Sequence, residues 1–228
     1  MIKNIFLDLD DTLLDFHKAE KNAIANTLSH FGVEPKEEYL SRYSELNLSQ
    51  WKLLEQGKTT REKLRIHRYE LLSREIGADI SAENAADYYE TRLSTGHFFM
   101  EGAEKLLQAL YGNYRIYIAS NGGVRVQRGR IASADIERYT DGIFLSQEIG
   151  ADKPSPEFFE RCFSRIDHFR KEETVIVGDS LTSDIKGGIN AGIKTIWYNP
   201  KCQPIQPDIT PAAEIHALSE LESLLKIL

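Results

Sequence analysis

Cysteine is scarce in this chain, which has only Cys162 and Cys202 among its 228 residues. Two cysteines are too few for a disulfide framework, so we expect a protein of a reducing, cytoplasmic compartment. Long apolar runs are absent as well, because none approaches the roughly 18 residues that a membrane span needs. The apolar run at the N-terminus stops at Asp8 and carries no cleavage site, which argues against a signal peptide.

Basic residues are outnumbered, since 28 lysines and arginines stand against 35 aspartates and glutamates, for a formal net charge of −7 at pH 7. This mildly acidic balance argues against non-specific binding to nucleic acid or to an anionic membrane. The six histidines are scattered without the spacing of metal ligands. With 41% hydrophobic and 28% charged residues, the composition is that of an ordinary globular protein rather than a disordered, collagen-like or coiled-coil one.

Five short apolar runs are typical of strands that are buried on both faces of a parallel sheet. They cover residues 5–7, 114–119, 143–145, 174–177 and 195–198. Helical patterns fall between the later runs, at about 124–134, 155–166 and 181–191, and a closing helix is expected at about 211–227. This alternation predicts an α/β protein with a doubly wound, Rossmann-like parallel sheet.

The interval between the first two runs does not fit that alternation. It spans about a hundred residues, whereas a crossover between parallel strands needs only about a dozen. Residues 101–111 predict the crossover helix, and apolar residues recur at three- and four-residue steps through most of the remainder. Thr60 opens a Thr-Arg-Glu-Lys segment that is typical of a helix start. We therefore expect an α/β core of residues 1–15 and 96–228, and an inserted all-helical subdomain of four helices at 16–95.

Two patterns resemble binding motifs only superficially. Gly57-Lys58-Thr59 looks like the end of a phosphate-binding P-loop, but Lys52 stands where that motif needs another glycine, and no strand precedes it. We interpret it as a turn between helices. Three arginines, Arg125, Arg128 and Arg130, make a basic helix start, which we interpret as a solvated face rather than a nucleic-acid site.

Acidic residues follow two of the expected strands. Asp8, Asp10 and Asp11 come after the first strand, and Asp179 and Asp184 come after the fourth. Taken singly, an aspartate after a strand often caps the next helix or forms a turn. Taken together, these carboxylates should converge at the carboxyl edge of the sheet, where they would repel one another strongly unless a cation lies among them. Oxygen ligands without histidine or cysteine indicate Mg²⁺ before Zn²⁺.

Two further strand ends offer groups that bind phosphate. The second strand ends in Ser120-Asn121-Gly122-Gly123, which supplies a hydroxyl group and backbone N–H groups to an anion. Lys153 follows the third strand, and the prolines at 154 and 156 restrict the backbone around it. A lone lysine is by default a surface residue, but this position among the other motifs favours a held ammonium group.

The order of these segments is similar to the four motifs of the haloacid dehalogenase (HAD) phosphatase superfamily. The matching segments are Asp8 to Thr12, Ser120-Asn121, Lys153-Pro154 and Gly178 to Asp184. The helical insert resembles the cap of that superfamily. Asp11 departs from the pattern, since many members carry glycine there, but acidic residues at this position occur in the nucleotidase group.

The resemblance implies a different role for each of the acidic residues. Asp8 would be the nucleophile that forms an aspartyl-phosphate, and Asp10 would protonate the leaving alkoxide and then activate water. Mg²⁺ would be held by the carboxylates of Asp8 and Asp179 and by the backbone carbonyl of Asp10, with Asp184 as an outer or alternate ligand. A dehalogenase needs no acid for its leaving group and its members usually lack an aspartate at the position of Asp10, so phosphoryl chemistry is favoured.

The same resemblance assigns the phosphate-binding groups. The Ser120 hydroxyl, the Asn121 N–H and the Lys153 ammonium would hold the phosphoryl oxygens, where charge spreads in the transition state.

The cap segments 47–51, 56–60, 64 and 68–69, together with the segment 184–192, look like the bacterial pyrimidine 5'-nucleotidase group. Asn47 and Trp51 stand four residues apart, so on a helix they share a face, and we predict that both bind the substrate. The alternative for Trp51 is packing in the core of the cap. The expected substrate is a small phosphorylated metabolite, namely a nucleoside 5'-monophosphate.

Two alternatives to a nucleotidase stay open at this stage. One is a phosphatase or phosphomutase that acts on sugar phosphates or other small phosphorylated metabolites. The other is a non-catalytic binding module, which is disfavoured because burying so much like charge would be costly without metal and substrate. We expect a monomer or homodimer, with neither nucleic acid nor membrane as a partner.

Overall fold

Six parallel strands form one sheet in the order β3-β2-β1-β4-β5-β6. Their bounds are β1 (Asn4–Leu7), β2 (Arg115–Ser120), β3 (Gly142–Leu145), β4 (Thr174–Gly178), β5 (Lys194–Tyr198) and β6 (Ala213–Ile215). From β1 the chain moves outward through β2 and β3, then returns to the other side of β1 and continues through β4, β5 and β6. The strand order reverses at β1, which places a crevice at the carboxyl end of that strand. The doubly wound parallel fold is confirmed.

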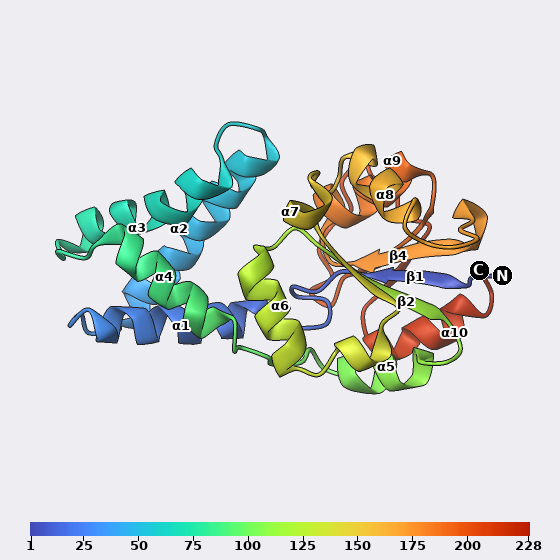
Figure 1. The fold of residues 1–228 in the computed structure, drawn as a ribbon, viewed down its shortest axis with the longest axis horizontal. Helices are drawn as coiled ribbons and strands as arrows, with labels where there is room; N and C mark the ends of the chain where they lie inside the picture. The colour runs from blue at the N-terminus through green and yellow to red at the C-terminus, as the bar shows by residue number, and fades with distance from the viewer. The chain divides into compact units, whose positions relative to one another are not determined.

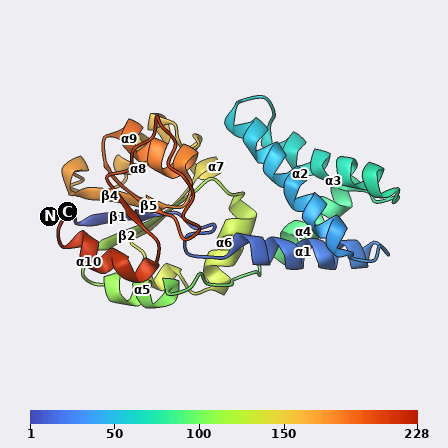
Figure 2. The same ribbon diagram turned by 180° about the vertical axis from the view of Figure 1, so that it is seen from behind.

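The computed structural model describes residues 1–228, and the chain divides into two units. The core unit combines Met1–Phe16 with His97–Leu228 and contains the sheet, and the cap unit is His17–Gly96. Figures 1 and 2 show the ribbon from opposite sides. No helix of either unit combines the length and the apolar character that crossing a membrane requires.

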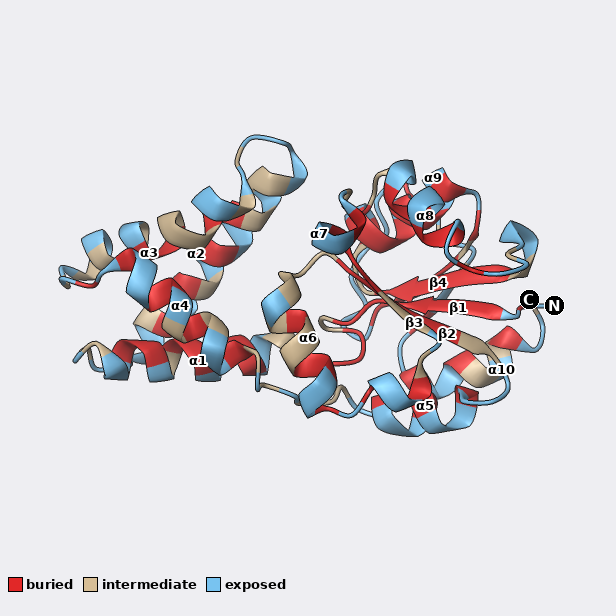
Figure 3. Cartoon of the chain, in the orientation of Figure 1, coloured by how far each residue is buried: buried red, intermediate tan, exposed pale blue.

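Helices cover both faces of the sheet in the core unit (Figures 1 and 2). One face carries α5 (Ala103–Leu110), α6 (Val124–Ser133) and α10 (Leu221–Leu225), and the other carries α7 (Ser146–Ile149), α8 (Pro156–Phe163) and α9 (Lys186–Ala191). Successive residues of a strand point to opposite faces, so Ile5 and Leu7 join the first apolar cluster and Phe6 joins the second. Every residue of β1 is buried, as Figure 3 shows. The close packing of the central strand therefore restricts the position of the residues that follow it, beginning with Asp8.

The cap unit consists of four helices, as expected. They are α1 (Phe16–His30), α2 (Glu37–Glu55), α3 (Arg61–Ile76) and α4 (Ala82–Leu93). The Thr60 hydroxyl accepts a hydrogen bond from the Lys63 N–H at 3.3 Å, which confirms the helix start at this residue. Residues 57–59 form the turn between α2 and α3, so the P-loop reading is excluded by the fold as well as by the sequence.

One expectation for the C-terminal part was wrong. The closing helix expected at 211–227 is instead β6, a 3₁₀ turn (η4, Leu218–Glu220) and the short α10. The buried residues Ile215, Leu218, Leu221 and Leu225 have a spacing that imitates a helix, although the first of them lies on a strand. The helix expected at 181–191 begins as a π-helical turn, η3 (Leu181–Ile185), before α9. Further 3₁₀ turns are η1 (Glu137–Tyr139) and η2 (Lys171–Glu173).

Candidate active site

Asp8 stands at the carboxyl end of the central strand. The preceding residue, Leu7, pairs with Ile118 of β2 and with Val177 of β4. The Asp8 N–H extends this pairing by donating to the Val177 carbonyl oxygen at 3.0 Å. Asp8 is therefore held between the ends of two neighbouring strands, at the reversal of strand order, and the residue is 7% exposed.

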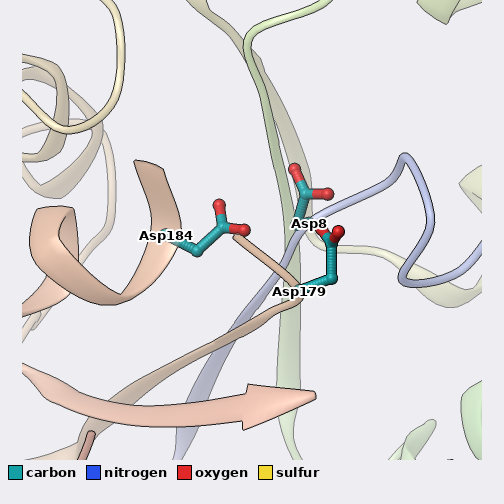
Figure 4. Close-up of side chains that lie close together, drawn as sticks. All are labelled: Asp8, Asp179 and Asp184. Carbon is teal, nitrogen blue, oxygen red and sulfur yellow. The ribbon is translucent and has the colours of Figure 1, made fainter. Parts of the chain in front are cut away.

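Three carboxyl groups converge beside this strand end (Figure 4). One oxygen from each of Asp8, Asp179 and Asp184 lies within 4.8 Å of the other two. Asp179 directly follows β4, and Asp184 belongs to η3. The structure thus brings together carboxylates from two strand ends that lie about 170 residues apart in the sequence.

Hydrogen bonds hold the backbone of Asp179 in place, and the lack of a side chain at Gly178 leaves room for Asp184. The Asp179 N–H donates to Thr12 Oγ1 at 3.2 Å, and its carbonyl oxygen accepts from Trp197 Nε1 at 2.8 Å. A Cβ atom on Gly178 would lie 2.2 Å from Asp184 Oδ2, so glycine is required for the close approach of that carboxylate. The positions of the carboxyl groups therefore depend on three neighbouring residues, Thr12, Gly178 and Trp197.

Burial and mutual repulsion perturb these carboxyl groups. Burial raises the pKa of Asp8 to about 8; Lys153 opposes this rise, and the charges of Asp184 and Asp10 add to it. Burial raises the pKa of Asp179 well above its usual range, and the charges of Asp8 and Asp184 add to that rise. A divalent cation would offset the repulsion. Because every donor is an oxygen, the set fits Mg²⁺.

Removing one of these charges should stabilise the protein when metal is absent. We expect Asp179→Asn to raise Tm in a chelator by roughly 2–8 °C, which corresponds to about 1–2 kcal/mol for relief of buried like charge. In the wild type, Mg²⁺ should raise Tm by binding the folded state, whereas the variant should show little of this gain. Differential scanning fluorimetry with and without Mg²⁺ measures both effects.

The exposed Asp208 provides a control of equal charge change. Asp208→Asn should leave both melting temperatures close to those of the wild type. An Asp179→Asn variant that melts lower than the wild type in chelator would contradict the account of repulsion. A full Mg²⁺ response in that variant would show that Asp179 is not a ligand.

Lys153 uses its ammonium group to connect the cluster to β2. Its Nζ donates at 2.6 Å to each of three oxygens, Asp8 Oδ1, Asp184 Oδ1 and the Ala119 carbonyl oxygen. Burial opposes the charge of the ammonium group, but Asp184 and Asp8 outweigh it and raise the pKa of Lys153. A fully charged ammonium group thus lies directly beside the carboxylate of Asp8.

Ser120 and Asn121 lie at the end of β2, as the sequence predicted. The Ser120 hydroxyl oxygen accepts from the Gly122 N–H at 3.1 Å. The Asn121 side chain makes two hydrogen bonds to the backbone of Lys153, donating to its carbonyl oxygen at 2.8 Å and accepting from its N–H at 2.9 Å. This pair of bonds fastens the loop that carries Lys153 to the end of β2.

Asp10 is contacted by two residues that we did not single out for this role. Gln127 Nε2 donates to Asp10 Oδ2 at 2.6 Å, and Arg130 Nη1 donates to Asp10 Oδ1. The interpretation of the basic helix start as a solvated face is therefore wrong for Arg130, whose side chain is 0% exposed. It holds for Arg125, which is exposed, and for Arg128, which is partly exposed and paired with Glu148 at 2.7 Å.

The conformation and contacts of Asp11 explain why an aspartate can stand where many HAD members carry glycine. Its backbone has φ of 57°, in the left-handed region that glycine favours and that aspartate tolerates better than most residues. Its Oδ1 accepts from the Phe16 N–H at 2.9 Å, at the start of α1. The aspartate therefore replaces glycine and caps a helix in addition.

The two cap residues predicted to bind substrate have different surroundings. Asn47 is 2% exposed, and its amide donates to Glu20 Oε1 at 2.6 Å and accepts from Arg68 Nη1 at 2.7 Å. Trp51 is only partly buried, and the Arg61 guanidinium lies 5.4 Å from the centroid of its ring. The substrate-binding role of both residues stays a prediction.

Comparison with known proteins identifies the family. Residues 5–198 match the model of the haloacid dehalogenase-like hydrolase family. The pyrimidine 5'-nucleotidase PynA of Streptococcus pneumoniae is 36% identical over 96% of this chain and 93% of its own length. The HAD-hydrolase YfnB of Bacillus subtilis is 35% identical over 99% of this chain and 96% of its own. The glyceraldehyde 3-phosphate phosphatase of Pyrococcus furiosus is 29% identical over 100% and 93%, respectively.

A solved structure agrees with these sequence relatives. The crystal structure of YfnB bound to magnesium has a TM-score of 0.94 to this chain, with 34% identity over 98% of both chains. The chain belongs to the haloacid dehalogenase-like hydrolase family. The resemblance drawn from the four motifs is confirmed.

Proposed function

We propose that the protein is a Mg²⁺-dependent phosphomonoester hydrolase that works through an aspartyl-phosphate on Asp8, with pyrimidine nucleoside 5'-monophosphates as its substrates. The observation that carries the proposal is that the carboxyl groups of Asp8, Asp179 and Asp184 converge, and that the Lys153 ammonium group donates hydrogen bonds to Asp8 and Asp184. Such a site combines a nucleophile, a place for a hard cation and a fixed positive charge. These three components together serve phosphoryl transfer through a covalent intermediate.

In the first step, a carboxylate oxygen of Asp8 forms a bond to phosphorus while the bond from phosphorus to the leaving alkoxide breaks. Asp10 gives its proton to that alkoxide. Lys153 and the Ser120 hydroxyl bind the phosphoryl oxygens, where charge accumulates in the transition state. Mg²⁺, when bound by the carboxylates of Asp8 and Asp179 and the backbone carbonyl of Asp10, offsets the charge of the transferring group. Asp184 would be an outer or alternate ligand.

In the second step, a water molecule attacks the phosphorus of the aspartyl-phosphate. Asp10 accepts a proton from that water, and the bond from phosphorus to Asp8 breaks, which restores the carboxylate and releases inorganic phosphate. One carboxyl group thus donates a proton and then accepts one. Members of the family that act as dehalogenases usually lack an aspartate at the position of Asp10, so its presence supports phosphate ester hydrolysis over dehalogenation.

One of the relatives supports the choice of nucleotide. PynA is named a pyrimidine 5'-nucleotidase and shares 36% of its residues with this chain. The second candidate is the same chemistry on a sugar phosphate or similar metabolite, which the glyceraldehyde 3-phosphate phosphatase supports at 29% identity. A phosphate-release screen over nucleoside and sugar monophosphates with Mg²⁺ separates the two. Preference for a sugar phosphate would replace the nucleotide assignment, and release from no ester would overturn the proposed function.

The partly buried Trp51 gives a more specific test of the nucleotide. If its indole stacks on the base, Trp51→Ala should lose about 1–3 kcal/mol of binding, by analogy with base stacking on aromatic side chains in nucleic-acid-binding proteins. The KM for a nucleoside monophosphate should then rise by roughly 5–150-fold. Activity on p-nitrophenyl phosphate, which has no base, should change little. Steady-state kinetics on both substrates measures the difference.

Trp51→Phe is the matched control, because it keeps an aromatic face. It should retain most of the affinity for the nucleotide. Equal losses on both substrates in Trp51→Ala would show that Trp51 only packs within the cap.

A further inference from the structure

Both carboxylate oxygens of Asp10 are held by one face of α6. Gln127 Nε2 donates to Oδ2 at 2.6 Å, and Arg130 Nη1 donates to Oδ1. The two side chains stand three residues apart, so they project from the same side of the helix. Each carboxylate oxygen can accept two hydrogen bonds, so each keeps acceptor capacity for a leaving group or a water molecule. Asp10 is also the more open partner, since its side chain is 30% exposed.

Gln127 connects Asp10 to the phosphate-binding serine. Its Nε2 donates a second hydrogen bond to Ser120 Oγ at 2.8 Å, and its Oε1 accepts from Arg130 Nη1 at 3.3 Å. This amide orientation is the one that the neighbours select, because the flipped amide would turn its oxygen toward the Asp10 carboxylate. Gln127 and Arg130 thus form one connected unit around Asp10.

These contacts also determine what the Ser120 hydroxyl can do. A serine hydroxyl has one donor hydrogen and can accept two hydrogen bonds. Ser120 Oγ accepts from the Gly122 N–H and from Gln127 Nε2, so both of its acceptor positions are used. Its own hydrogen is therefore left to donate, as binding of a phosphoryl oxygen requires.

The surrounding backbone leaves room for the Gln127 side chain. A Cβ atom on Gly122 would lie 2.2 Å from Gln127 Nε2, so a larger residue there would displace the amide. On the other side, the Arg130 guanidinium lies 5.8 Å from the centroid of the Phe16 ring. Both side chains are nearly inaccessible to solvent, with Gln127 1% and Arg130 0% exposed.

We propose that Gln127 and Arg130 are positioning residues, which hold the Asp10 carboxyl group and the Ser120 hydroxyl in the orientations that the two reaction steps use. The inference rests on the proposed function, because it assigns Asp10 its role in proton transfer. Fixed hydrogen bonds remove the rotation of the carboxyl group that would otherwise have to be restricted in each transition state. Arg130 contacts Asp10 directly and reaches Ser120 only by way of the Gln127 amide, whereas Gln127 contacts both Asp10 and Ser120.

The first test compares Arg130→Met with Arg128→Met in α6, with p-nitrophenyl phosphate as substrate and Mg²⁺ present. The p-nitrophenolate that leaves from this substrate needs little protonation, so the first step depends only weakly on Asp10. Arg130→Met should keep the initial burst of p-nitrophenol, slow steady-state turnover by about 10–100-fold and accumulate phosphoenzyme. Arg128→Met, on the exposed side of the same helix, should behave like the wild type. Rapid acid quench measures the burst and the phosphoenzyme.

A double-mutant cycle separates positioning from packing. In an Asp10→Asn background the residue that Arg130 orients is already disabled, so Arg130→Met should add about twofold or less. Gln127→Met should still raise KM in that background, because it also releases Ser120. Circular dichroism and melting curves check that each variant folds. If Arg130→Met does not fold, Gln127→Met and Arg130→Lys complete the test, and Arg130→Lys should show a smaller loss of the same pattern.

Each result has a distinct meaning. Equal losses in the burst and in steady-state turnover, or a full additional loss in the Asp10→Asn background, would show that the pair only supports packing and would overturn the inference. The proposed function would survive that outcome. It would fail if the wild type released phosphate from no ester, p-nitrophenyl phosphate included.

Discussion

Asp8→Asn should abolish turnover while the fold survives. The asparagine amide occupies the same space, but it has no carboxylate oxygen to form the bond to phosphorus. Loss of a covalent nucleophile typically costs on the order of 10⁴–10⁶-fold in kcat. Phosphate release from a nucleoside monophosphate, followed to the limit of detection, measures the loss, and circular dichroism monitors the fold.

A neighbouring substitution controls for the change of charge. Asp11→Asn removes a carboxylate from the same loop, and asparagine also tolerates the left-handed backbone found there. Its side-chain oxygen can still accept from the Phe16 N–H, so activity should be largely preserved. If Asp8→Asn keeps even about a tenth of wild-type activity, Asp8 is not the nucleophile.

Asp10→Asn should separate the two steps of the reaction. An amide can neither protonate an alkoxide nor accept a proton from water, so kcat for a nucleotide should fall by about 10²–10⁴-fold. With p-nitrophenyl phosphate the variant should still load phosphate onto the enzyme, because this leaving group needs little protonation. The release of that phosphate should be slow, and single-turnover measurements of both phases check the expectation. Rapid dephosphorylation in the variant would contradict the role assigned to Asp10.

The strand ends of the site could be predicted because the signals are local. Asp8 and Asp179 each come directly after a short apolar run, and parallel strands deliver such residues to one edge of a sheet. No end of the five predicted strands lies more than one residue from the observed one, which left the order of the motifs intact. Charge repulsion then predicted a cation among carboxylates, without any knowledge of the distances.

The supporting residues could not be predicted in the same way. Gln127 and Arg130 lie on a helix whose sequence does not reveal which side faces Asp10, so Arg130 was assigned to the surface. Trp197 supports the Asp179 carbonyl oxygen from β5, at a separation of 18 residues that has no local pattern. The C-terminal strand was missed because Ile215 and Leu218 have helical spacing. These features depend on tertiary packing, which decides between local arrangements that the sequence pattern alone does not distinguish.

The buried network around Asn47 shows the same limit in the cap. The pattern indicated that Asn47 and Trp51 share a helix face, which is a statement about direction along one helix. It did not indicate that the Asn47 amide is hydrogen-bonded to Glu20 and Arg68, which belong to two other helices. Prediction of substrate contacts therefore needs the packing of the cap as well as its periodicity.

The most direct test of the central claim is to locate the phosphoryl group on the enzyme. The Asp10→Asn variant is mixed with p-nitrophenyl phosphate and Mg²⁺, quenched in acid, reduced with borohydride to convert a phosphorylated aspartate to homoserine, and digested for mass spectrometry. The account predicts homoserine at position 8 and an unmodified Asp11 in the same peptide. Conversion at another aspartate, or consumption of one equivalent of substrate with no conversion at all, would contradict it.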